Sequence, residues 1–209
     1  MKPILLTLAL FVAVAGFAQK VESLPAPNAK KMLKMSLGQT LQQRQSIREY
    51  STKAIDSQTL GTLLWAACGI NRPADGRITA PSAINAQDIT VYVCRADGAW
   101  RYEPKDHSLV LVTAQDLRPA VAGRQAFAAE APVCLVLVSD LGKFRMPNPH
   151  MELGAMDAGY VSENICLACT ALGLATVPRA SMDKNALTEA LGLNEKQILM
   201  LNNPVGWPK

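Results

Sequence analysis

The sequence predicts an α+β fold in which helices cover a sheet. Segments with helical and with strand character are mixed along the chain, without regular strand–helix alternation. A continuous apolar run over Val133–Ser139 is typical of a strand that is buried on both faces. The segment Glu152–Leu172 has apolar residues at helical spacing and ends at Gly173, so it is expected to be the longest helix. No internal repeat or domain break is visible, which indicates one domain.

The first 18 residues are expected to be a secretory signal peptide. Lys2 provides a short positive region, Ile4–Phe17 is almost wholly apolar, and small residues flank a candidate cleavage point after Ala18. The apolar run is shorter than the about 20 residues that a membrane span needs, although an uncleaved anchor is the alternative. The sequence therefore predicts a periplasmic or secreted protein, in which residues 19–29 form a linker before a domain at residues 30–209.

Two helices are expected near the start of that domain. Leucines recur every four residues over Lys30–Arg44 and predict one apolar helical face. A second helix is expected to begin after Asp56, a suitable N-cap, and to end at Gly69. The polar stretch Asn71–Gln87 follows, and loops of this length are commonly functional.

Short elements complete the domain. Strands are expected at residues 89–94, 100–103, 109–112, 175–177 and 198–201, and a helix at residues 117–127. A further helix is expected to be capped by Asp183 and to end at Gly192, and Pro204–Pro208 is expected to form a closing turn.

Several functional classes lack support in the sequence. The net charge of +4 is modest and is not gathered in a basic block, so nucleic-acid binding is not expected. His107 and His150 have no second His or Cys at ligand spacing, which argues against a metal site. A Ser-His-Asp nucleophile elbow, a Walker loop and a dinucleotide glycine fingerprint are all missing from the sequence, which disfavours hydrolase and Rossmann interpretations.

The five cysteines are an odd number, so at least one stays unpaired within a monomer. Cys166-x-x-Cys169 raises the question of a redox role. Such a pair usually lies where a helix N-terminus lowers the thiol pKa, but this pair lies inside the long helical pattern. We expect the cysteines mainly to act as small buried hydrophobes.

One candidate ligand segment ends the first expected helix. In an extended chain alternate residues point the same way, so Arg44, Ser46 and Arg48 could face one ligand. Two guanidinium forks and a hydroxyl suit a phosphate and the polar edge of a cofactor. The alternative is that both arginines are solvated surface charges.

Two further segments offer small residues and backbone donors. Ala80–Gln87 leaves room for a flat ligand, although it could be an ordinary loop that enters the next strand. In Thr176–Ser181, Pro178 limits backbone pairing, so later N–H groups could meet a ligand. The alternative there is a plain strand-to-helix turn.

Taken in order, these segments resemble the FMN-dependent nitroreductase family. The matching stretches are RQSIREY at Arg44–Tyr50, APSAINAQ at Ala80–Gln87, EAPVCLVLV at Glu130–Val138, GLATVP at Gly173–Pro178 and PVGWP at Pro204–Pro208. The resemblance covers about residues 30 to 209. It looks closest to the branch that includes peptide thiazoline and oxazoline dehydrogenases, through the hairpin RYEPKDHSLVLV and the DLR at Asp116–Arg118.

The resemblance implies a mostly antiparallel sheet covered by helices and an intertwined homodimer with two FMN sites at its interface. It places Arg44 and Ser46, with Gln45 between them, at the phosphate, and Arg48 near the pyrimidine edge of the flavin. The residues implied on the flavin bound mainly by the other subunit are Pro81, Ser82, Ala83 and Asn85.

The remaining implied contacts lie later in the chain. Gln125 is implied within reach of the ring, and the backbone after Pro178, at Arg179 and Ala180, near the reactive nitrogen of the flavin. Many relatives carry Gly soon after the Val-Pro pair, where this chain has Arg179-Ala180-Ser181. Longer relatives continue with a basic tail, so Lys209 either supplies that phosphate contact itself or the contact is absent.

The function implied is an exported FMN-dependent oxidoreductase that passes two electrons by a ping-pong route to nitroaromatics, quinones or similar flat acceptors. The expected partners are a second copy of the chain and a small-molecule electron donor and acceptor, without stable membrane insertion once the signal is removed. One alternative is a flavin-dependent dehydrogenase of a peptide heterocycle, and another is a non-catalytic exported FMN-binding protein. We assign no side chain as a general acid.

Overall fold

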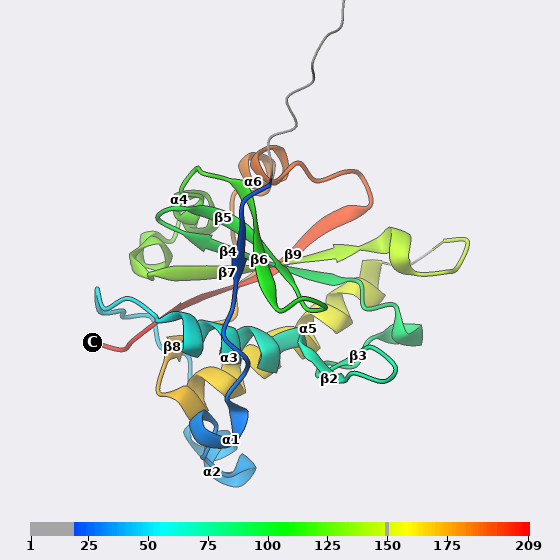
Figure 1. Ribbon diagram of the computed structural model, residues 1–209. Helices are drawn as coiled ribbons and strands as arrows, with labels where there is room; N and C mark the ends of the chain where they lie inside the picture. Colours follow the sequence, from blue (N-terminus) through cyan, green and yellow to red (C-terminus); the bar gives the residue numbers. More distant parts are fainter. Residues whose placement is uncertain (1–18, 149–150) are drawn as a thin grey trace, which may run out of the picture.

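The structure is a computed structural model that describes residues 19–148 and 151–209. The expected signal peptide and His150 therefore lie outside the described residues. Figure 1 shows a central sheet with helices on both sides. Among the described residues this sheet has seven strands in the order β1-β6-β5-β4-β7-β9-β8, and each neighbouring pair is antiparallel. The predicted α+β fold, with a mostly antiparallel sheet under helices, is confirmed.

The elements have the following bounds. The strands of the main sheet are β1 (Val21–Ser23), β4 (Ile89–Arg95), β5 (Gly98–Glu103), β6 (Ser108–Thr113), β7 (Val133–Asp140), β8 (Ala175–Thr176) and β9 (Gln197–Gly206). A separate hairpin consists of β2 (Ile70–Arg72) and β3 (Arg77–Ile78). The helices are α1 (Ala29–Met32), α2 (Leu37–Gln43), α3 (Ser57–Cys68), α4 (Arg118–Ala122), α5 (Met151–Leu172) and α6 (Lys184–Leu191), with short 3₁₀ turns η1 (Ala83–Asn85), η2 (Ala126–Glu130) and η3 (Leu141–Lys143). Among the described residues, none of the helices has the length and apolar character that crossing a membrane requires.

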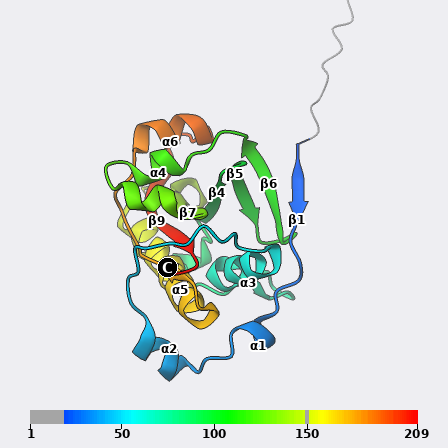
Figure 2. The ribbon, with the colours of Figure 1, turned by 90° about the vertical axis from the view of Figure 1, so that its left-hand side faces the viewer.

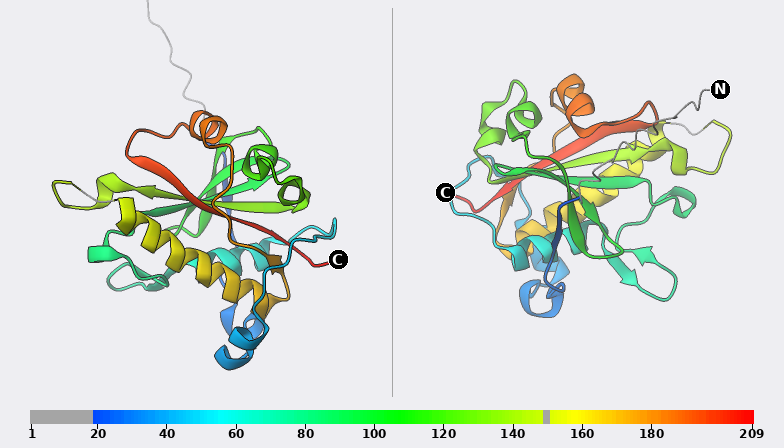
Figure 3. Two further views of the ribbon diagram at one scale, coloured as in Figure 1. Left: turned by 180° about the vertical axis from the view of Figure 1, so that it is seen from behind. Right: turned by 45° about the horizontal axis from the view of Figure 1, so that its top comes forward.

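Strand β7 lies at the centre of the core, because both of its faces are covered. Leu135 and Leu137 pack in the cluster that includes α3 and α5, whereas Val136 and Val138 pack in the cluster that includes α4 and α6. Figures 2 and 3 show these two pairs of helices on opposite faces of the sheet. A strand in this position needs an apolar residue at nearly every place, which is what the continuous run predicted.

The predicted caps hold two of the helices. The Asp56 carboxylate accepts the Thr59 N–H at 2.8 Å at the start of α3. Asp183 accepts the Ala186 N–H at 3.1 Å at the start of α6. Gly192 ends α6 with a φ of 64°, a left-handed conformation that glycine adopts readily.

The helix expected over Lys30–Arg44 is divided into α1 and α2. Ser36 starts α2 with a capping box, in which its hydroxyl accepts the Gln39 N–H and the Gln39 side chain accepts the Ser36 N–H. The expected apolar face is buried only in part, since Leu33 packs against the core whereas Leu37 is 68% exposed and Leu41 is 56% exposed. Figure 2 shows α1 and α2 projecting from the body of the molecule.

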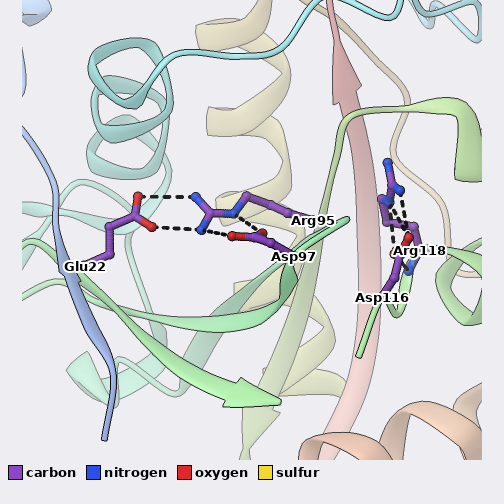
Figure 4. Close-up of polar contacts among 5 residues, drawn as sticks. All are labelled: Glu22, Arg95, Asp97, Asp116 and Arg118. Atoms are coloured by element: carbon purple, nitrogen blue, oxygen red, sulfur yellow. Dashed lines mark hydrogen bonds and ion pairs between the residues drawn. The ribbon is translucent and has the colours of Figure 1, made fainter. Parts of the chain in front are cut away.

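Residues 19–29, expected as a linker, include an edge strand of the sheet. In β1, Val21 pairs with Val110 of β6. Glu22 accepts two hydrogen bonds from Arg95, at 2.8 and 3.2 Å (Figure 4). A strand of three residues is too short for an alternating pattern to reveal it. The segment after the proposed cleavage point is therefore part of the folded domain.

The closing turn expected at Pro204–Pro208 is replaced in part by strand β9, which continues through Gly206. Pro204 pairs with Cys134 of β7, but β8 reaches only Val205 and Gly206 on the other side. Pro204 therefore has no partner in β8 and lies in an edge-like position, where a residue without an N–H is tolerated.

The DLR motif fastens the start of α4. Arg118 donates to Asp116 at 2.7 Å (Figure 4). It also donates to the carbonyl of Ala131 at 3.3 Å. This ion pair lowers the pKa of Asp116. The motif thus has a structural role within the chain.

Candidate functional site

The Arg44–Tyr50 segment lies extended against the edge of the sheet at β8. The Ile47 N–H donates to the Thr176 carbonyl at 3.0 Å. The buried Tyr50 forms a bridge with Pro208 and donates its hydroxyl to the Ile47 carbonyl at 3.2 Å. These contacts fix the backbone from inside, while Arg44 remains partly exposed and Gln45, Ser46 and Arg48 are exposed. The segment is therefore held in place with its polar side chains available to a ligand.

The turn after Pro178 is fixed by a buried arginine. The Arg179 guanidinium donates to Gln125 at 2.8 Å, to Asn202 at 2.8 Å and to the carbonyl of Ala122 at 2.9 Å. Asn202 also donates to the Ser181 carbonyl at 3.1 Å. Burial lowers the pKa of Arg179 below its usual value. Arg179 thus gives this turn a set of internal anchors.

One expected backbone donor is already used. The Arg179 N–H donates to the Asn202 carbonyl at 2.8 Å, and the Asn202 N–H donates back at 2.7 Å. The Arg179 N–H is therefore taken by a bridge to β9, while the implied position of this backbone near the flavin stays a prediction. The exposed Ala180 follows directly, and its N–H is the remaining candidate at the turn.

Gln125 and Lys209 lie at the borders of this region. The Gln125 side-chain oxygen accepts from Arg179, so its amide nitrogen is the group left to meet a ligand. Lys209 lies 3.6 Å from Glu130 in an ion pair in which both side chains are more than half exposed. Surface pairs of this kind contribute little, so Lys209 could exchange Glu130 for a phosphate at small cost.

The Cys-x-x-Cys pair lies beneath the Arg44 segment and is not built for redox exchange. Burial raises the pKa of the Cys166 thiol to about 11, although nearby Arg44 acts to lower it. Burial also raises the pKa of Cys169 well above its ordinary value. Asn203, buried at the same place, accepts the Ser162 hydroxyl at 2.8 Å and contacts the Cys166 sulfur. Thiols with raised pKa values carry little thiolate, so both cysteines act as buried packing residues.

Residues 81–85 lie at the other end of α5. The Ala83 N–H donates to both carboxylate oxygens of Asp157, at 2.9 and 3.1 Å. By contrast, the positive charge of Arg44 acts to lower the pKa of the Cys166 thiol, so Arg44 lies near a residue nine positions further along the helix. At 1.5 Å per residue, these two positions are about 14 Å apart along the helix axis. Figure 1 shows the Arg44–Tyr50 segment near the C-terminus and η1 on the opposite side of the molecule. One chain therefore does not bring these two halves of the predicted site together.

The half formed by residues 81–85 borders a cavity of about 340 Å³. Its walls are Pro81, Ser82, Ala83, Leu153, Met156, Asp157 and Tyr160. Asn85 is exposed beside this cavity, on the η1 turn. Small residues and one buried carboxylate leave an open face, which suits a flat ligand brought by another chain.

Large apolar side chains are exposed around both halves. Besides Leu37 and Leu41 on α2, they include Ile84 on η1, which is 62% exposed, and Met156 and Tyr160 on α5, which are 53% and 47% exposed. A groove of about 270 Å³ lies between α2 and α5 and is lined mostly by apolar residues. Exposed apolar surface of this kind usually marks an interface.

Residues 41–207 match a family described as the nitroreductase family. The chain belongs to the nitroreductase family. Members of this family generally use flavin cofactors, are commonly dimeric and act on small molecules. The chain is accordingly an oxidoreductase of this family.

Individual nitroreductase-family relatives cover most of the chain. A crystal structure of an assigned nitroreductase from Ralstonia eutropha JMP134 is 37% identical, covers 90% of each chain and has a TM-score of 0.83. An assigned nitroreductase of Methanocaldococcus jannaschii is 29% identical over 82% of this chain and 91% of its own length. A chain of the E. coli microcin synthetase complex McbBCD has a TM-score of 0.72 at 16% identity, over 96% of this chain and 79% of that chain. At this level of identity the similarity shows only the fold.

The donors at the first half of the site fit a flavin mononucleotide. Arg44, Ser46 and Arg48 combine two cations and a hydroxyl, which is the chemistry that a phosphate and a polar ring edge require. The buried Thr176 hydroxyl has no hydrogen-bond partner among the described residues, although its backbone carbonyl is bonded to Ile47. An unsatisfied buried hydroxyl at this position is consistent with a polar ligand beside β8.

Four buried polar residues near the site escaped the sequence analysis. They are Asp88, Asp157, Asn202 and Asn203. Asp157 lies between Met156 and Ala158, and the Asn202–Asn203 pair interrupts the apolar run of β9. Polar residues at such places are a signal that could have found them, because a buried polar group must have a structural or functional partner.

Proposed function

We propose that this nitroreductase-family protein binds FMN at the interface of a homodimer and transfers two electrons by a ping-pong route. The separation of the two halves of the site within one chain supports this proposal most directly. The residues facing a phosphate lie at one end of α5, and the loop suited to a flat ring lies about 14 Å away along the helix. A two-fold axis that buries the exposed faces of α2 and α5 would let each loop reach the partner's cofactor.

Each half would contribute differently to the bound cofactor. Arg44 and Ser46 would hold the phosphate, with Gln45 beside them, and Arg48 would face the pyrimidine edge. The Ala180 N–H would donate to the ring, and the partner subunit's Ser82 and Asn85 would cover the flavin. When bound, FMN supplies the two-electron redox chemistry, while the protein provides binding, orientation and electrostatics.

Flat electron acceptors fit an open site of this construction. The assigned nitroreductases among the relatives favour nitroaromatic acceptors, and quinones share the same planar, electron-poor character. In a ping-pong route the donor leaves before the acceptor enters, so both molecules use the same exposed face of the ring. No side chain of the described residues has to act as a general acid in this proposal.

The absorbance spectrum of the purified protein tests the cofactor. We expect a flavin spectrum, release of FMN on denaturation, one FMN for each chain, and parallel double-reciprocal lines when donor and acceptor are varied together. The apoprotein should regain the spectrum with FMN and less tightly with riboflavin. Purified protein that lacks flavin and takes up neither compound would contradict the proposal.

We also propose that the protein is exported and processed after Ala18. Cleavage there would leave β1 intact, because the first residue of that strand is Val21. Fractionated cells should contain a periplasmic or secreted form whose N-terminal residue is Gln19. Recovery of only full-length protein in the cytosol would contradict the export proposal without affecting the cofactor proposal.

A further inference from the structure

The loop that is suited to cover the flavin has a strained backbone. Ile84, Asn85 and Gln87 have φ values of 49°, 56° and 47°. Asn tolerates the left-handed region, but a β-branched residue such as Ile84 is rarely found there. Strained conformations of this kind persist only when the surrounding structure holds them. The contacts that hold this loop therefore decide whether it keeps its shape.

The main buried anchor of the loop is Asp157 on α5. Its carboxylate accepts the Ala83 N–H through both oxygens, and its side chain is almost wholly buried. The other anchors lie at the loop ends, where the Ser82 hydroxyl accepts the Gln87 N–H at 2.9 Å and Lys143 donates to the Gln87 carbonyl at 3.0 Å. Asp157 is thus the anchor beneath the centre of the loop.

Asp157 itself rests on a second buried carboxyl. Asp88 is completely buried, its Oδ1 has no hydrogen-bond partner among the described residues, and the neighbouring Asp157 carboxyl acts to raise its pKa. The Ser139 hydroxyl donates to Asp88 Oδ2 at 2.5 Å. Gly154 makes room for this contact, because a Cβ at that position would lie 2.3 Å from the Ser139 hydroxyl oxygen. Asp88 and Asp157 are therefore closely packed against β7, through Ser139, and against α5, at Gly154.

The chemistry of this pair requires a proton. Two ionised carboxylates side by side in a buried position repel each other, and a carboxylate can only accept hydrogen bonds, so one partner of the pair is expected to be protonated. Both oxygens of Asp157 accept from Ala83, whereas Oδ1 of Asp88 has no partner among the described residues and burial raises the pKa of Asp88, so Asp88 is the partner expected to carry the proton. Other charged groups nearby are occupied elsewhere, since Asp140 accepts the Gly142 N–H and Lys143 donates to Gln87.

We propose that Asp157, through a proton held by Asp88, is the positioning residue that keeps the Ser82–Gln87 loop in its cofactor-binding shape. This inference rests on the proposed function for its consequence, because the loop is taken to cover the partner's flavin. Loss of the shared proton would place two negative charges side by side in a buried position, and the loop would be released to separate them.

The direction of the pH dependence follows from the pair. Burial and the neighbouring Asp157 raise the pKa of Asp88 to about 7. The pKa in the released loop is the ordinary value, so the ordered loop binds one more proton than the released loop between about pH 4 and pH 7. Ordering is therefore fully favoured at low pH and is lost as the pH rises through about 7.

The first test compares FMN affinity at pH 5 and pH 8 in wild-type protein and in Asp88→Asn. An Asn at this position can accept from Ser139 and donate to Asp157 without titrating. We expect the affinity of wild-type protein, divided by that of Asp88→Asn, to fall by up to about a hundredfold between the two pH values. This ratio removes the titration of the FMN phosphate itself. Asp140→Asn, a neighbouring carboxylate outside the pair, should behave as wild type.

The proposal would be overturned if the FMN affinities of wild-type protein and Asp88→Asn changed by the same factor between pH 5 and pH 8. It would also be overturned if Asp140→Asn changed in the way that Asp88→Asn does. If Asp88→Asn does not fold, Asp157→Asn replaces it, because that amide can accept from Ala83 and donate to an ionised Asp88. Its profile should also be flat, and a profile equal to wild type would overturn the proposal.

The second test separates this inference from the cofactor proposal. Hydrogen exchange at the Ala83 amide is measured in the apoprotein, again as a ratio of wild type to Asp88→Asn at each pH. We expect wild-type protection to fall relative to the variant between pH 5 and pH 8 on the same scale. A constant ratio would overturn the positioning role whether or not FMN binds. A changing ratio without FMN binding would leave the role intact and contradict the proposed function.

Discussion

Replacing Arg44 with Ala is expected to weaken FMN binding about ten- to a hundredfold and to leave riboflavin binding nearly unchanged. Charge-assisted hydrogen bonds to a phosphate are worth about 1.5–3 kcal/mol each, and 1.4 kcal/mol corresponds to a factor of ten in affinity. The structure places Arg44 at the end of α2, partly exposed, on a backbone that is tied to β8 through Ile47 and Thr176. The substitution should thus remove a ligand contact without disturbing the fold.

The measurement is a fluorescence titration of the apoprotein with FMN and with riboflavin. Arg77→Ala is the matched control, because Arg77 is a half-exposed arginine on β3 that forms an ion pair with the similarly exposed Asp75. This control should bind both compounds as wild type does. If Arg44→Ala weakens FMN and riboflavin by the same factor, Arg44 is not a phosphate ligand and its assignment is wrong.

Elements with a local physical cause could be predicted from the sequence. The apolar run of β7 reflects two covered faces, and Asp56 and Asp183 reflect the unpaired N–H groups at the start of α3 and α6. Each of these signals depends on residues that are close in the chain. Their agreement with the structure shows that local chemistry determines these boundaries.

Elements that depend on distant partners could not be predicted in the same way. Strand β1 forms because it can pair with the edge strand β6. Strand β9 continues past Pro204 because β8 does not extend to Pro204, so no N–H is needed there. The break before α2 did have a local signal, the Ser36–Gln39 capping box, but the leucine spacing across it suggests one continuous helix. The spacing of apolar residues also does not distinguish a helix face that is buried in the core from a face that another chain would cover.

The site shows the same division. The Arg44–Arg48 segment lies beside β8, just before the turn after Pro178, through the bond between Ile47 and Thr176, while the ligand contacts of both segments stay predictions. The use of the Arg179 N–H by Asn202 could not be foreseen, because it depends on a bridge between residues 23 positions apart. The pairing of Asp88 with Asp157 likewise could not be predicted, because it depends on the packing of α5 beside the start of β4.

The proposed homodimer accounts for both the divided site and the exposed apolar faces of α2 and α5. It predicts that a functional site draws residues from two chains. A chain with Arg44→Ala and Arg48→Ala loses the phosphate half, and a chain with Ser82→Trp and Asn85→Ala loses the ring-covering half. Either homodimer should therefore bind little FMN.

The most direct measurement is the FMN content of the heterodimer formed from these two chains, isolated through a different tag on each. Under two-fold symmetry, one of its sites combines both intact halves and the other combines both damaged halves. The account predicts that FMN binding returns to about half of the wild-type level. If each subunit builds its own site, both sites of the heterodimer stay damaged, and a heterodimer without bound FMN would contradict the account.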